Sequence, residues 1–516
     1  MTNAAPSPAA EPSVIDGAVT ADTADTSVTD HERATAGSTP VAAEPSTPPG
    51  HRSAIPIALR QSLPGVVAAV FVVSAAKSVG DPDTFWHIAA GDRLRETWVF
   101  TGPDPWSTMS SQPWRLHEWL PELVMSVMRQ ALGLPGVSWL LPLAAAGFAV
   151  AAWRAVRSEA SLLIASIVMA LTMTSLTISL SLRPQMVTFT LAVVTTHAWL
   201  GTARDGRARW WLIPLTWLWA CSHGMWFVGP AVGAVALLGI LLDGRVRGRA
   251  WLRLVGVPVG SVVAAALTPV GPGLLLSPAA VRETTQFIEE WRSPALTDAS
   301  FVAFLVLAGA TLLVWSRGRY RPSWTSLLLL ATATGFALVY ARTIPVGAAV
   351  LAPVAAAALQ ASSGLAREPV RRAEVALTLG LTIVGLVIAA ALAPSRGALP
   401  AWGPNDLDPA IAALPADTVV CNDYGSGGWL IYSHPNVRPA IDGRIEVYAV
   451  DYVRAYQAFE TASPGWQSYL ARTSCHWALL PTDLPVTEAL TAQAGWEVAD
   501  RGADHVLLRA PDSSPR

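Results

Sequence analysis

Two carboxylates and two ring-bearing side chains follow directly on the first long apolar run of the chain. Asp81 and Asp83 flank a proline, and Trp86 and His87 come shortly after them. Ionisable residues so close to a span-length apolar run are usually functional, because charge near a bilayer is costly. A carboxylate there can take a proton from a hydroxyl group, and two carboxylates can hold a divalent cation. The segment therefore predicts a chemically active site at a membrane surface.

The same connection carries a second group of polar and aromatic residues before the next apolar run. Asp104 comes first, and Trp114, His117 and Glu118 follow. Imidazole and carboxylate groups can bind the hydroxyl groups of a substrate, and Trp86 and Trp114 are the two tryptophans best placed to face one. We predict that the connection over residues 81–133 is an outer loop that holds the active site.

The composition places this site in a polytopic membrane protein. Hydrophobic residues make up 52% of the 516 residues and charged residues only 14%, whereas soluble domains carry about 25% charged residues. Apolar runs near the length of a membrane span recur along the chain. They fall at about 62–80, 134–153, 160–180, 185–201, 210–222, 225–242, 251–268, 299–316, 324–341, 343–360 and 374–393. We predict an all-α membrane domain over residues 56–395 with about eleven transmembrane helices.

Arginine clusters in alternate connections set the expected orientation of the spans. The clusters are Arg52 and Arg60, Arg154 and Arg157, Arg204 to Arg209, Arg245 to Arg253, Arg317 to Arg321, and Arg367 to Arg372. Basic residues collect on the cytoplasmic side of the plasma membrane, so we expect the N-terminus inside and the loop 81–133 outside. Residues 1–55 lack aromatic residues and are expected to be a disordered cytoplasmic tail. The net charge of −2, without a basic tract, argues against a nucleic-acid partner.

Polar residues outside the arginine clusters gather on the predicted outer side. Besides the loop 81–133, they include Arg183, His223, Glu290 and Arg342. These residues are far apart in sequence, so a common site would explain their accumulation on one side. The alternative is that the outer connections simply hold whatever charge the protein has. We predict that these residues join the loop in one substrate-binding site.

Short motifs mark the outer ends of the spans. They are Asp81-Pro82-Asp83, Phe85-Trp86-His87, the segment 114–119, Leu182-Arg183-Pro184-Gln185, Ser222-His223-Gly224, Thr268-Pro269-Val270-Gly271, the segment 287–294 and Ala341-Arg342. Their order resembles that of the GT-C superfamily of polytopic membrane glycosyltransferases, in particular its RgtA/B/C/D-like and dolichyl-phosphate-mannosyltransferase-like members. The resemblance implies transfer of a sugar from a polyprenyl-phosphate donor to a lipid or glycan acceptor of the cell envelope.

The residues of the motifs fit the demands of that reaction. The acceptor hydroxyl must lose its proton as it attacks the anomeric carbon, and Asp83 is the first candidate for the base, with Asp81 as the alternative. The departing lipid phosphate needs a preorganised cation, for which Arg342 is the first candidate and Arg183 the second. Members of the superfamily differ in their need for metal, so Mg²⁺ or Mn²⁺ held by Asp81 and Asp83 remains an option.

Each motif also has a purely structural explanation. Asp81 and Asp83 could cap a helix or form a solvated turn, and His223 could only hydrogen-bond across helices. His87 and His117 lack the spacing of a metal motif, which favours polar contacts to substrate or to neighbouring carboxylates. For the whole protein, the alternatives are a transporter or flippase of a lipid-linked saccharide, which needs no carboxylate base, and a non-catalytic envelope-assembly protein.

Residues 400–516 have a different pattern that predicts a small extracytoplasmic α/β domain. Strands are expected at 418–421, 437–441, 477–480, 497–499 and 505–508, and helices at 451–460, 465–473 and 485–493. The glycine-rich segment 422–429 predicts tight turns that pack this domain on the membrane part, with phosphate binding at a helix start as the alternative. Asp442 and Arg444 belong to an Asp-Gly turn or, alternatively, recognise substrate. Cys421 and Cys475 leave a disulfide open.

Overall fold

The computed structural model describes residues 57–276, 291–318 and 321–511. They belong to one compact unit that begins at Ile55. The predicted tail 1–55 and the site candidate Glu290 lie outside the described residues. The proposed domain boundaries stay a prediction.

Each predicted apolar run coincides with a helix. The helices are α1 (Ile57–Ser74), α3 (Trp119–Arg157), α4 (Leu162–Leu176), α5 (Gln185–Asp205), α6 (Leu212–Ala220), α7 (Val228–Leu242), α8 (Ala250–Ala266), α10 (Ala299–Ser316), α11 (Trp324–Val339), α12 (Ile344–Ser363) and α13 (Arg372–Arg396). Seven of the described helical segments are long and apolar enough to cross a membrane, judged by length and composition alone. The all-α architecture is confirmed, whereas the number of spans stays a prediction.

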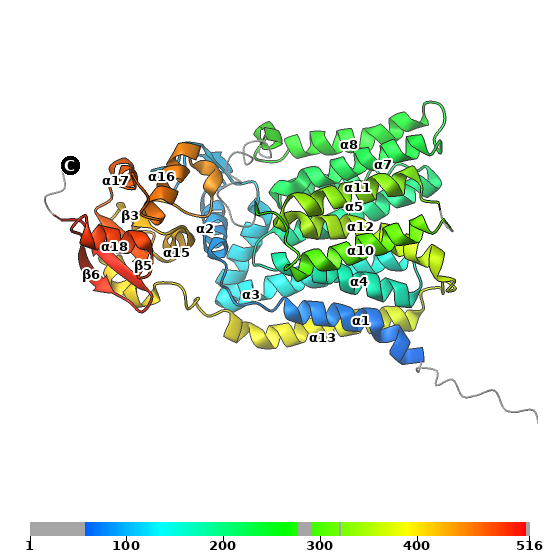
Figure 1. Cartoon of the computed structure of the whole chain (residues 1–516), viewed down its shortest axis with the longest axis horizontal. Coiled ribbons are helices and arrows are strands. Elements are labelled where there is room, and N and C mark those ends of the chain that lie inside the picture. Colours follow the sequence, from blue (N-terminus) through cyan, green and yellow to red (C-terminus); the bar gives the residue numbers. More distant parts are fainter. Residues whose placement is uncertain (1–56, 277–290, 319–320, 512–516) are drawn as a thin grey trace, which may run out of the picture. The chain divides into compact units, whose positions relative to one another are not determined.

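The helices of the bundle run up and down, so their connections fall at two ends (Figure 1). The arginine-bearing connections, such as those between α7 and α8 and between α12 and α13, lie at one end. Helix α2 (Pro82–Thr97) and the start of α3 lie at the other end. The arrangement agrees with the separation of basic clusters and site residues that the sequence predicts.

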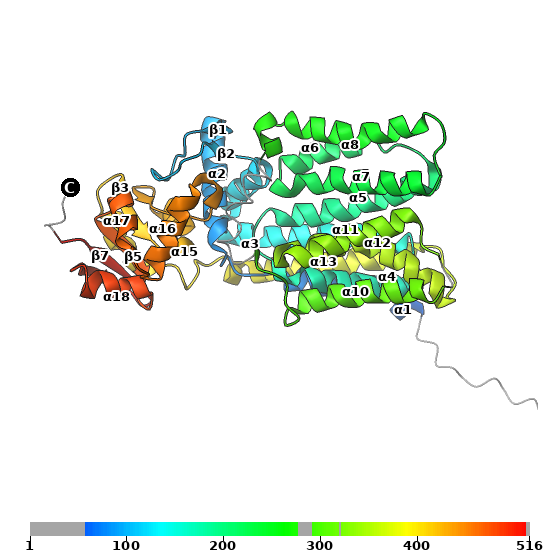
Figure 2. The same cartoon turned by 45° about the horizontal axis from the view of Figure 1, so that its top comes forward.

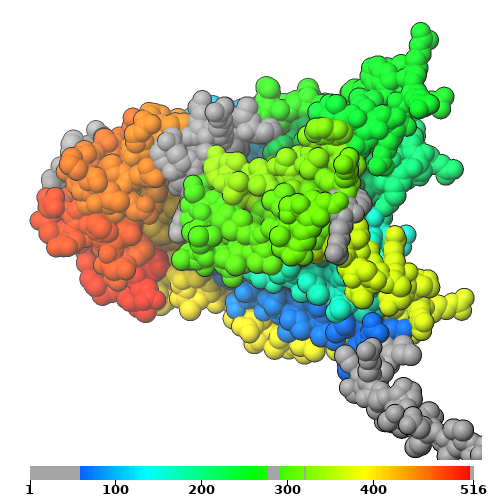
Figure 3. Space-filling model, turned by 45° about the vertical axis from the view of Figure 1, so that its right-hand side comes forward, coloured from blue at the N-terminus to red at the C-terminus, as the bar shows by residue number. Residues whose placement is uncertain are grey.

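Helices α1 and α13 pack along each other at the edge of the bundle, as the blue and yellow segments of Figure 3 show. A Cβ atom at Gly65 would lie 2.8 Å from the carbonyl oxygen of Leu377, and one at Gly385 would lie 3.1 Å from that of Ala69. Glycine at these positions lets the two backbones approach closely, which is how helices associate in a lipid environment.

The predicted outer loop 81–133 contains a helix, α2, which corrects the expectation of a loop. Asp81 caps α2, because its Oδ1 accepts a hydrogen bond from the Asp83 N–H at 3.0 Å, and Pro82 occupies the first turn. Proline is favoured there because the first N–H groups of a helix have no partner within it. Helix α2 lies against α3 so closely that a Cβ atom at Gly91 would be 2.0 Å from the carbonyl oxygen of Glu122. The helix-cap alternative was therefore right for Asp81.

Two short strands follow α2 and form a hairpin-like pair. Strand β1 (Thr101–Gly102) pairs antiparallel with β2 (Trp114–Arg115). The pair leads the chain back to the start of α3, directly before His117 and Glu118. The fold thereby returns the second polar group of the connection toward α2.

The C-terminal region carries a five-stranded sheet (Figure 2). Its strands are β3 (Thr418–Asn422), β4 (Val437–Pro439), β5 (Trp477–Pro481), β6 (Glu497–Arg501) and β7 (His505–Arg509). The order is β4-β3-β5-β7-β6, with β4, β3 and β5 parallel and β7 antiparallel to both of its neighbours. Helices α16 (Val450–Glu460), α17 (Gln467–Thr473) and α18 (Pro485–Ala492) confirm the predicted helices. Cys421 and Cys475 form a disulfide with a Cα–Cα distance of 5.9 Å.

The glycine-rich segment is a helix, α15 (Tyr424–Ser433), and the expectation of tight turns was wrong. Asp423 caps it by accepting a hydrogen bond from the Ser426 N–H at 3.0 Å. A Cβ atom at Gly428 would lie 2.4 Å from the carbonyl oxygen of Pro82, so this glycine permits contact between α15 and α2. The glycines serve close packing, and α2 lies between α15 and α3.

Candidate functional site

Most of the predicted site residues line one cavity of about 780 Å³. The predicted residues on its wall are Asp83, Trp86, His87, His117, Glu118, Arg183, His223 and Arg342. They come from α2, from the start of α3 and from the connections that precede α5, α7 and α12. The predicted convergence of these distant segments is therefore observed in space, although the role of each residue stays a prediction.

Arg183 binds both carboxylates of the Asp-Pro-Asp motif. Its Nε donates to Oδ2 of Asp81 at 2.8 Å, and its Nη1 lies 3.1 Å from Oδ2 of Asp83. Asp81 uses its other oxygen to cap α2, so it holds the helix start and the guanidinium at once. Asp83 reaches the cavity, whereas Asp81 stands behind it. The guanidinium of Arg183 thus neutralises part of the negative charge of the two aspartates, which the sequence analysis also considered as ligands of a metal ion.

Asp83 is also covered by the C-terminal region. A Cβ atom at Gly443 would lie 1.8 Å from Asp83 Oδ1 and 3.0 Å from Trp86 Nε1. Only a glycine can therefore occupy that position without displacing the carboxylate. Asp83 is 8% exposed, and its remaining access is toward the cavity.

His87 is held by an acidic residue that the sequence reading missed. Its Nδ1 lies 2.9 Å from Oε1 of Glu122, and both side chains are almost fully buried. Burial lowers the pKa of His87 to about 3, although the charge of Glu118 opposes that shift. The ring is therefore neutral at neutral pH. The signal that could have revealed Glu122 is its place one helical turn after Glu118 at the start of an apolar helix.

Glu118 lies among three imidazole rings. Its Oε2 is 3.8 Å from Nε2 of His87, and its Oε1 is 3.7 Å from Nε2 of both His117 and His223. Oε1 also accepts a hydrogen bond from the Gly224 N–H at 3.3 Å. His87, Glu118 and Glu122 each offer a ligand atom within 4.8 Å of the others, so a divalent cation fits this part of the wall.

Another part of the cavity wall is mostly apolar. Helix α11 presents Thr332, Gly335, Phe336 and Val339 at helical spacing, and Met225 and Phe227 also line the space. Arg342 also lines the cavity, with its guanidinium carbon 5.8 Å from the ring centre of Trp291. The cavity therefore combines apolar lining residues with acidic and basic groups.

The C-terminal region completes the polar end of the cavity. Tyr424, Gly443, Ile445, Glu446 and Val447 are part of the wall. Burial raises the pKa of Tyr424, and the charge of Asp83 raises it further. Burial also raises the pKa of Glu446, against the effect of His117. The sequence analysis marked the segments that contain Tyr424 and Gly443, but it missed Ile445, Glu446 and Val447, which directly follow the Asp-Gly turn.

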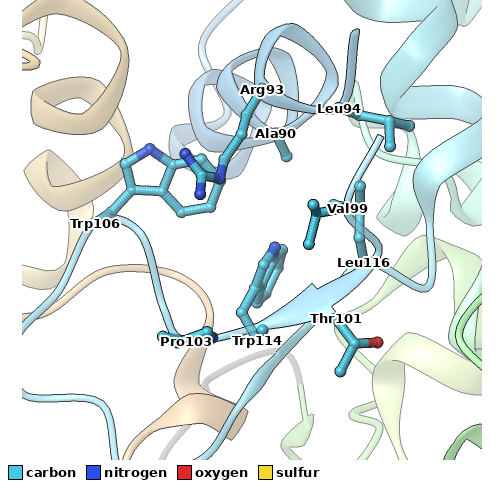
Figure 4. Close-up of a pocket in the computed structure, with 10 residues that line it drawn as sticks. Ala90, Arg93, Leu94, Val99, Thr101, Pro103, Trp106, Trp114 and Leu116 are labelled. Atoms are coloured by element: carbon cyan, nitrogen blue, oxygen red, sulfur yellow. The ribbon is translucent and has the colours of Figure 1, made fainter. Parts of the chain in front are cut away.

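Asp104 lies outside the cavity and binds Arg444 instead of lining the predicted site. Its Oδ2 is 3.0 Å from Nη1 of Arg444, and both side chains are fully buried. The guanidinium carbon of Arg444 lies 4.7 Å from the ring centre of Trp106 and 4.8 Å from that of Trp114. The two rings also line a small pocket of about 50 Å³ next to α2 (Figure 4). This cluster joins the connection after α2 to the C-terminal region. Of its residues, Trp114 also lines the cavity.

No protein-family model and no curated protein matches the chain. A structure of the archaeal oligosaccharyltransferase AglB from Archaeoglobus fulgidus, in complex with an inhibitory peptide and a dolichol-phosphate, superposes with a TM-score of 0.52 at 12% identity, covering 82% of this chain and 69% of that chain. A second structure of the Archaeoglobus fulgidus oligosaccharyltransferase, tethered to an acceptor peptide, gives 0.53 at 12% identity and covers 83% and 70%. The chain shares its fold with these two oligosaccharyltransferase structures.

The apolar helices and the fold shared with AglB together indicate that this chain is a multi-pass membrane protein. A structure of ArnT from Cupriavidus metallidurans bound to undecaprenyl phosphate covers 89% of this chain and 99% of that chain at 15% identity. Its TM-score of 0.41 is too low to support a conclusion about fold. A structural likeness at such low sequence identity establishes the fold alone and leaves the reaction to be argued from the site.

Proposed function

We propose that this GT-C protein transfers a sugar from a polyprenyl-phosphate donor to an acceptor of the cell envelope. The observation that carries the proposal is the cavity, whose wall combines apolar residues of α11 with Arg342, Arg183 and two carboxylates, Asp83 and Glu118. A polyprenyl chain needs an apolar surface, its phosphate needs a cation, and a sugar hydroxyl needs a base. One cavity offers all three.

In the proposed reaction, the acceptor oxygen bonds to the anomeric carbon as the bond from that carbon to the phosphate oxygen breaks. Asp83 takes the proton of the acceptor hydroxyl, and Arg342 stabilises the charge that develops on the lipid phosphate. Arg183 orients Asp83 through the 3.1 Å contact and is in turn fixed by Asp81. A shielded carboxylate held in this way is ready to accept a proton without reorganisation of solvent.

Two further features support the proposal. The AglB structure with similar fold is bound to a dolichol-phosphate, which is a polyprenyl phosphate. The disulfide between Cys421 and Cys475 fits a C-terminal region outside the cytoplasm, because disulfides persist in oxidising compartments. Arginine-rich connections at the far end of the helices support a cytoplasmic side there, and therefore support a cavity at the outer face.

The predicted Mg²⁺ or Mn²⁺ at Asp81 and Asp83 is not part of this proposal. Arg183 already contacts Oδ2 of both carboxylates, and a second cation at the same oxygens would be repelled by it. The base and phosphate roles assigned above do not depend on a metal ion.

Sugar transfer by the purified protein in lipid tests the proposal. Radiolabelled polyprenyl-phosphate sugars are supplied with cell-envelope extract, and label that moves into the acceptor is counted. We expect transfer by the unaltered protein and a loss of at least about 100-fold in Asp83→Asn, because general-base catalysis contributes that much or more. Arg342→Ala should also lose transfer.

Asp92→Asn is the matched control. Asp92 lies on the same helix but pairs with Arg129 at 3.0 Å and lines no part of the cavity. The Asp92→Asn variant should transfer sugar at the same rate as the unaltered protein. Saturable binding of donor without transfer by any variant would favour transport of a lipid-linked saccharide, and full activity of Asp83→Asn would remove Asp83 from the role of base.

A further inference from the structure

A second pocket, of about 520 Å³, shares no described lining residue with the cavity. We call it the outer pocket. Its wall includes Arg93 and Glu96 of α2, Trp106 of the connection that follows, and Tyr432 of α15. Glu96 comes about two and a half helical turns after His87, so the two residues lie on opposite sides of α2. The outer pocket has the volume of a small-molecule site, about 300–1,000 Å³, and the reaction proposed above does not use it.

Two opposite charges in the outer pocket stay unpaired within the described part of the chain. Arg93 and Glu96 are exposed and lie three residues apart on one helix, yet neither side chain forms a hydrogen bond or an ion pair there. Opposite charges at this spacing normally attract each other. Asp92 differs, because its Oδ2 pairs with Arg129 at 3.0 Å and its Oδ1 accepts from the Ser126 hydroxyl at 2.6 Å. The outer pocket therefore keeps one charged donor and one charged acceptor for a ligand.

Two aromatic rings border the outer pocket and are held in place from behind. The guanidinium carbon of Arg444 lies 4.7 Å from the ring centre of Trp106, and the ring centre of Tyr432 lies 5.5 Å from that of Phe85. Both side chains are only half-buried and line the outer pocket. A sugar combines apolar ring faces with hydroxyl groups that donate and accept hydrogen bonds. An uncharged saccharide therefore matches the two rings, the guanidinium and the carboxylate together, whereas a phosphate ion would be repelled by Glu96.

A row of tryptophans connects the outer pocket to the cavity. Arg93 and Trp106 also line the small pocket of about 50 Å³ (Figure 4), and Trp114 lines both that small pocket and the cavity. The ring centres of Trp106 and Trp114 are 5.9 Å apart, and those of Trp114 and Trp86 are 5.8 Å apart. Trp86 in turn lines the cavity. The outer pocket is thus two ring contacts away from the cavity in which we propose sugar transfer.

We infer that the outer pocket binds an uncharged oligosaccharide, namely the part of the acceptor glycan that does not react. The inference rests on the proposed function, because it assigns the acceptor of that reaction to a chemical class. One end of the glycan reaches the cavity, and the sugars behind it rest on Trp106 and Tyr432 and hydrogen-bond with Arg93 and Glu96. Contacts remote from the reacting bond stabilise the bound acceptor and the transition state alike, so they lower KM and leave kcat unchanged.

Oligosaccharide binding by the full-length protein in detergent tests the inference without any sugar donor. Neutral oligosaccharides are released from cell-envelope extract by mild acid, separated from charged ones by anion exchange, and labelled with a fluorophore at the reducing end. Fluorescence anisotropy then measures their binding as the protein is titrated. We expect saturable binding that the same unlabelled oligosaccharides compete away and that free monosaccharides at equal concentration do not.

Arg93→Gln and Glu96→Gln remove the two unpaired charges one at a time. Both side chains are exposed, so the variants should fold as the unaltered protein does. Each should weaken oligosaccharide binding by at least about 10-fold, because a hydrogen bond to a charged group is lost. Arg501→Gln and Glu497→Gln are the matched controls, because they make the same changes on β6, where both residues are exposed and line neither the cavity nor the two pockets. The affinity of these controls should match that of the unaltered protein.

Sugar transfer gives a second measurement. With the same oligosaccharides as acceptor, Arg93→Gln and Glu96→Gln should raise KM by at least about 10-fold and leave kcat unchanged. Asp92 binds Arg129 and Ser126 rather than the ligand, so Asp92→Asn stays the control for the base when transfer is compared at saturating acceptor.

The inference is overturned if the unaltered protein binds none of the oligosaccharides, or if Arg93→Gln and Glu96→Gln bind them as tightly as the β6 controls do. Displacement of the label by glycerophosphoethanolamine, the headgroup of a zwitterionic phospholipid, would overturn it in favour of a lipid site. Binding that is lost in the two variants, without sugar transfer by any protein, would refute only the proposed reaction and leave a saccharide site. Transfer by both variants at the KM of the unaltered protein would refute only the inference.

Discussion

Replacement of Arg444 by leucine should unfold the junction between the C-terminal region and the connection after α2. Arg444 is fully buried between Trp106 and Trp114. Its Nε and Nη2 donate to the two carboxylate oxygens of Asp442 at 2.8 and 2.6 Å, and its Nη1 forms an ion pair with Asp104 at 3.0 Å. Burial by itself would lower the pKa of Arg444, but the two carboxylates outweigh it and raise that pKa.

The magnitude follows from what the substitution leaves behind. Leucine fills part of the space but leaves the carboxylates of Asp104 and Asp442 without their cation. Removal of one partner from a buried ion pair costs about 3–5 kcal/mol, because the remaining charge is desolvated and uncompensated. Arg444→Lys keeps the charge and loses the two parallel hydrogen bonds to Asp442. Its free energy of unfolding should therefore lie between that of the unaltered protein and that of Arg444→Leu.

Unfolding in detergent by urea, followed by near-ultraviolet circular dichroism, measures the effect. Arg472→Leu is the control, because Arg472 pairs with Asp451 at 2.8 Å on the surface, where both side chains are largely exposed. Such pairs add little stability. Asp104→Asn in the Arg444→Leu background should recover part of the loss, since it removes one unpaired charge. The reasoning is refuted if Arg444→Leu lowers the free energy of unfolding no more than Arg472→Leu does.

Three further predictions concern the C-terminal region. Gly443→Ala should reduce sugar transfer by at least about 10-fold in the radiolabel assay. The added Cβ atom would lie 1.8 Å from Asp83 Oδ1, and overpacking costs about 1–3 kcal/mol. Replacement of Cys421 and Cys475 by alanine should lower the free energy of unfolding by about 4 kcal/mol in the loop-entropy model, given their separation of 54 residues; urea unfolding without reductant measures it. Burial raises the pKa of Tyr448 and neighbouring tyrosines. The free energy of unfolding should therefore fall as the pH rises above about 10, where only the unfolded chain loses these protons. Tyrosinate absorbance measures the ionisation.

Each of these predictions has an outcome that contradicts it. Gly425→Ala is the control for Gly443→Ala, because its Cβ atom would meet nothing closer than 3.1 Å, and equal activity of the two variants would exclude the proposed clash. Unchanged unfolding of the cysteine variant under oxidising conditions would remove the disulfide as a source of stability. Gradual ionisation of all tyrosines near pH 10, without unfolding, would show that the tyrosines are not shielded in the folded state.

The architecture could be predicted from the sequence because it depends on local pattern. Apolar runs of span length form helices wherever lipid leaves the backbone no other hydrogen-bond partners, and alternating residues with turn signals predicted the strands β3 to β7. Two segments were misread for local reasons. The glycines of 424–433 suggested turns although packing made them a helix, and the polar residues of α2 suggested a loop.

The sequence also predicted which residues lie at the same end of the bundle. Successive spans alternate in direction, so the membrane itself divides the connections into two sets. That constraint was enough to group Asp83, His87, Glu118, Arg183 and Arg342 on one side, and the structure places all of them on one cavity. It could not exclude Asp104, which shares that side but is directed toward Arg444.

The sequence by itself determined the helices, the strands and the side of the bundle on which the polar residues gather, because hydrophobic patterning and the bilayer act along the chain. Only the tertiary structure decided the contacts between segments that are far apart in the sequence. Glu122 behind His87, Gly443 over Asp83 and three imidazoles around Glu118 depend on distances between segments that glycine contacts bring together. Such distances arise from packing of side chains in three dimensions, which no periodicity records.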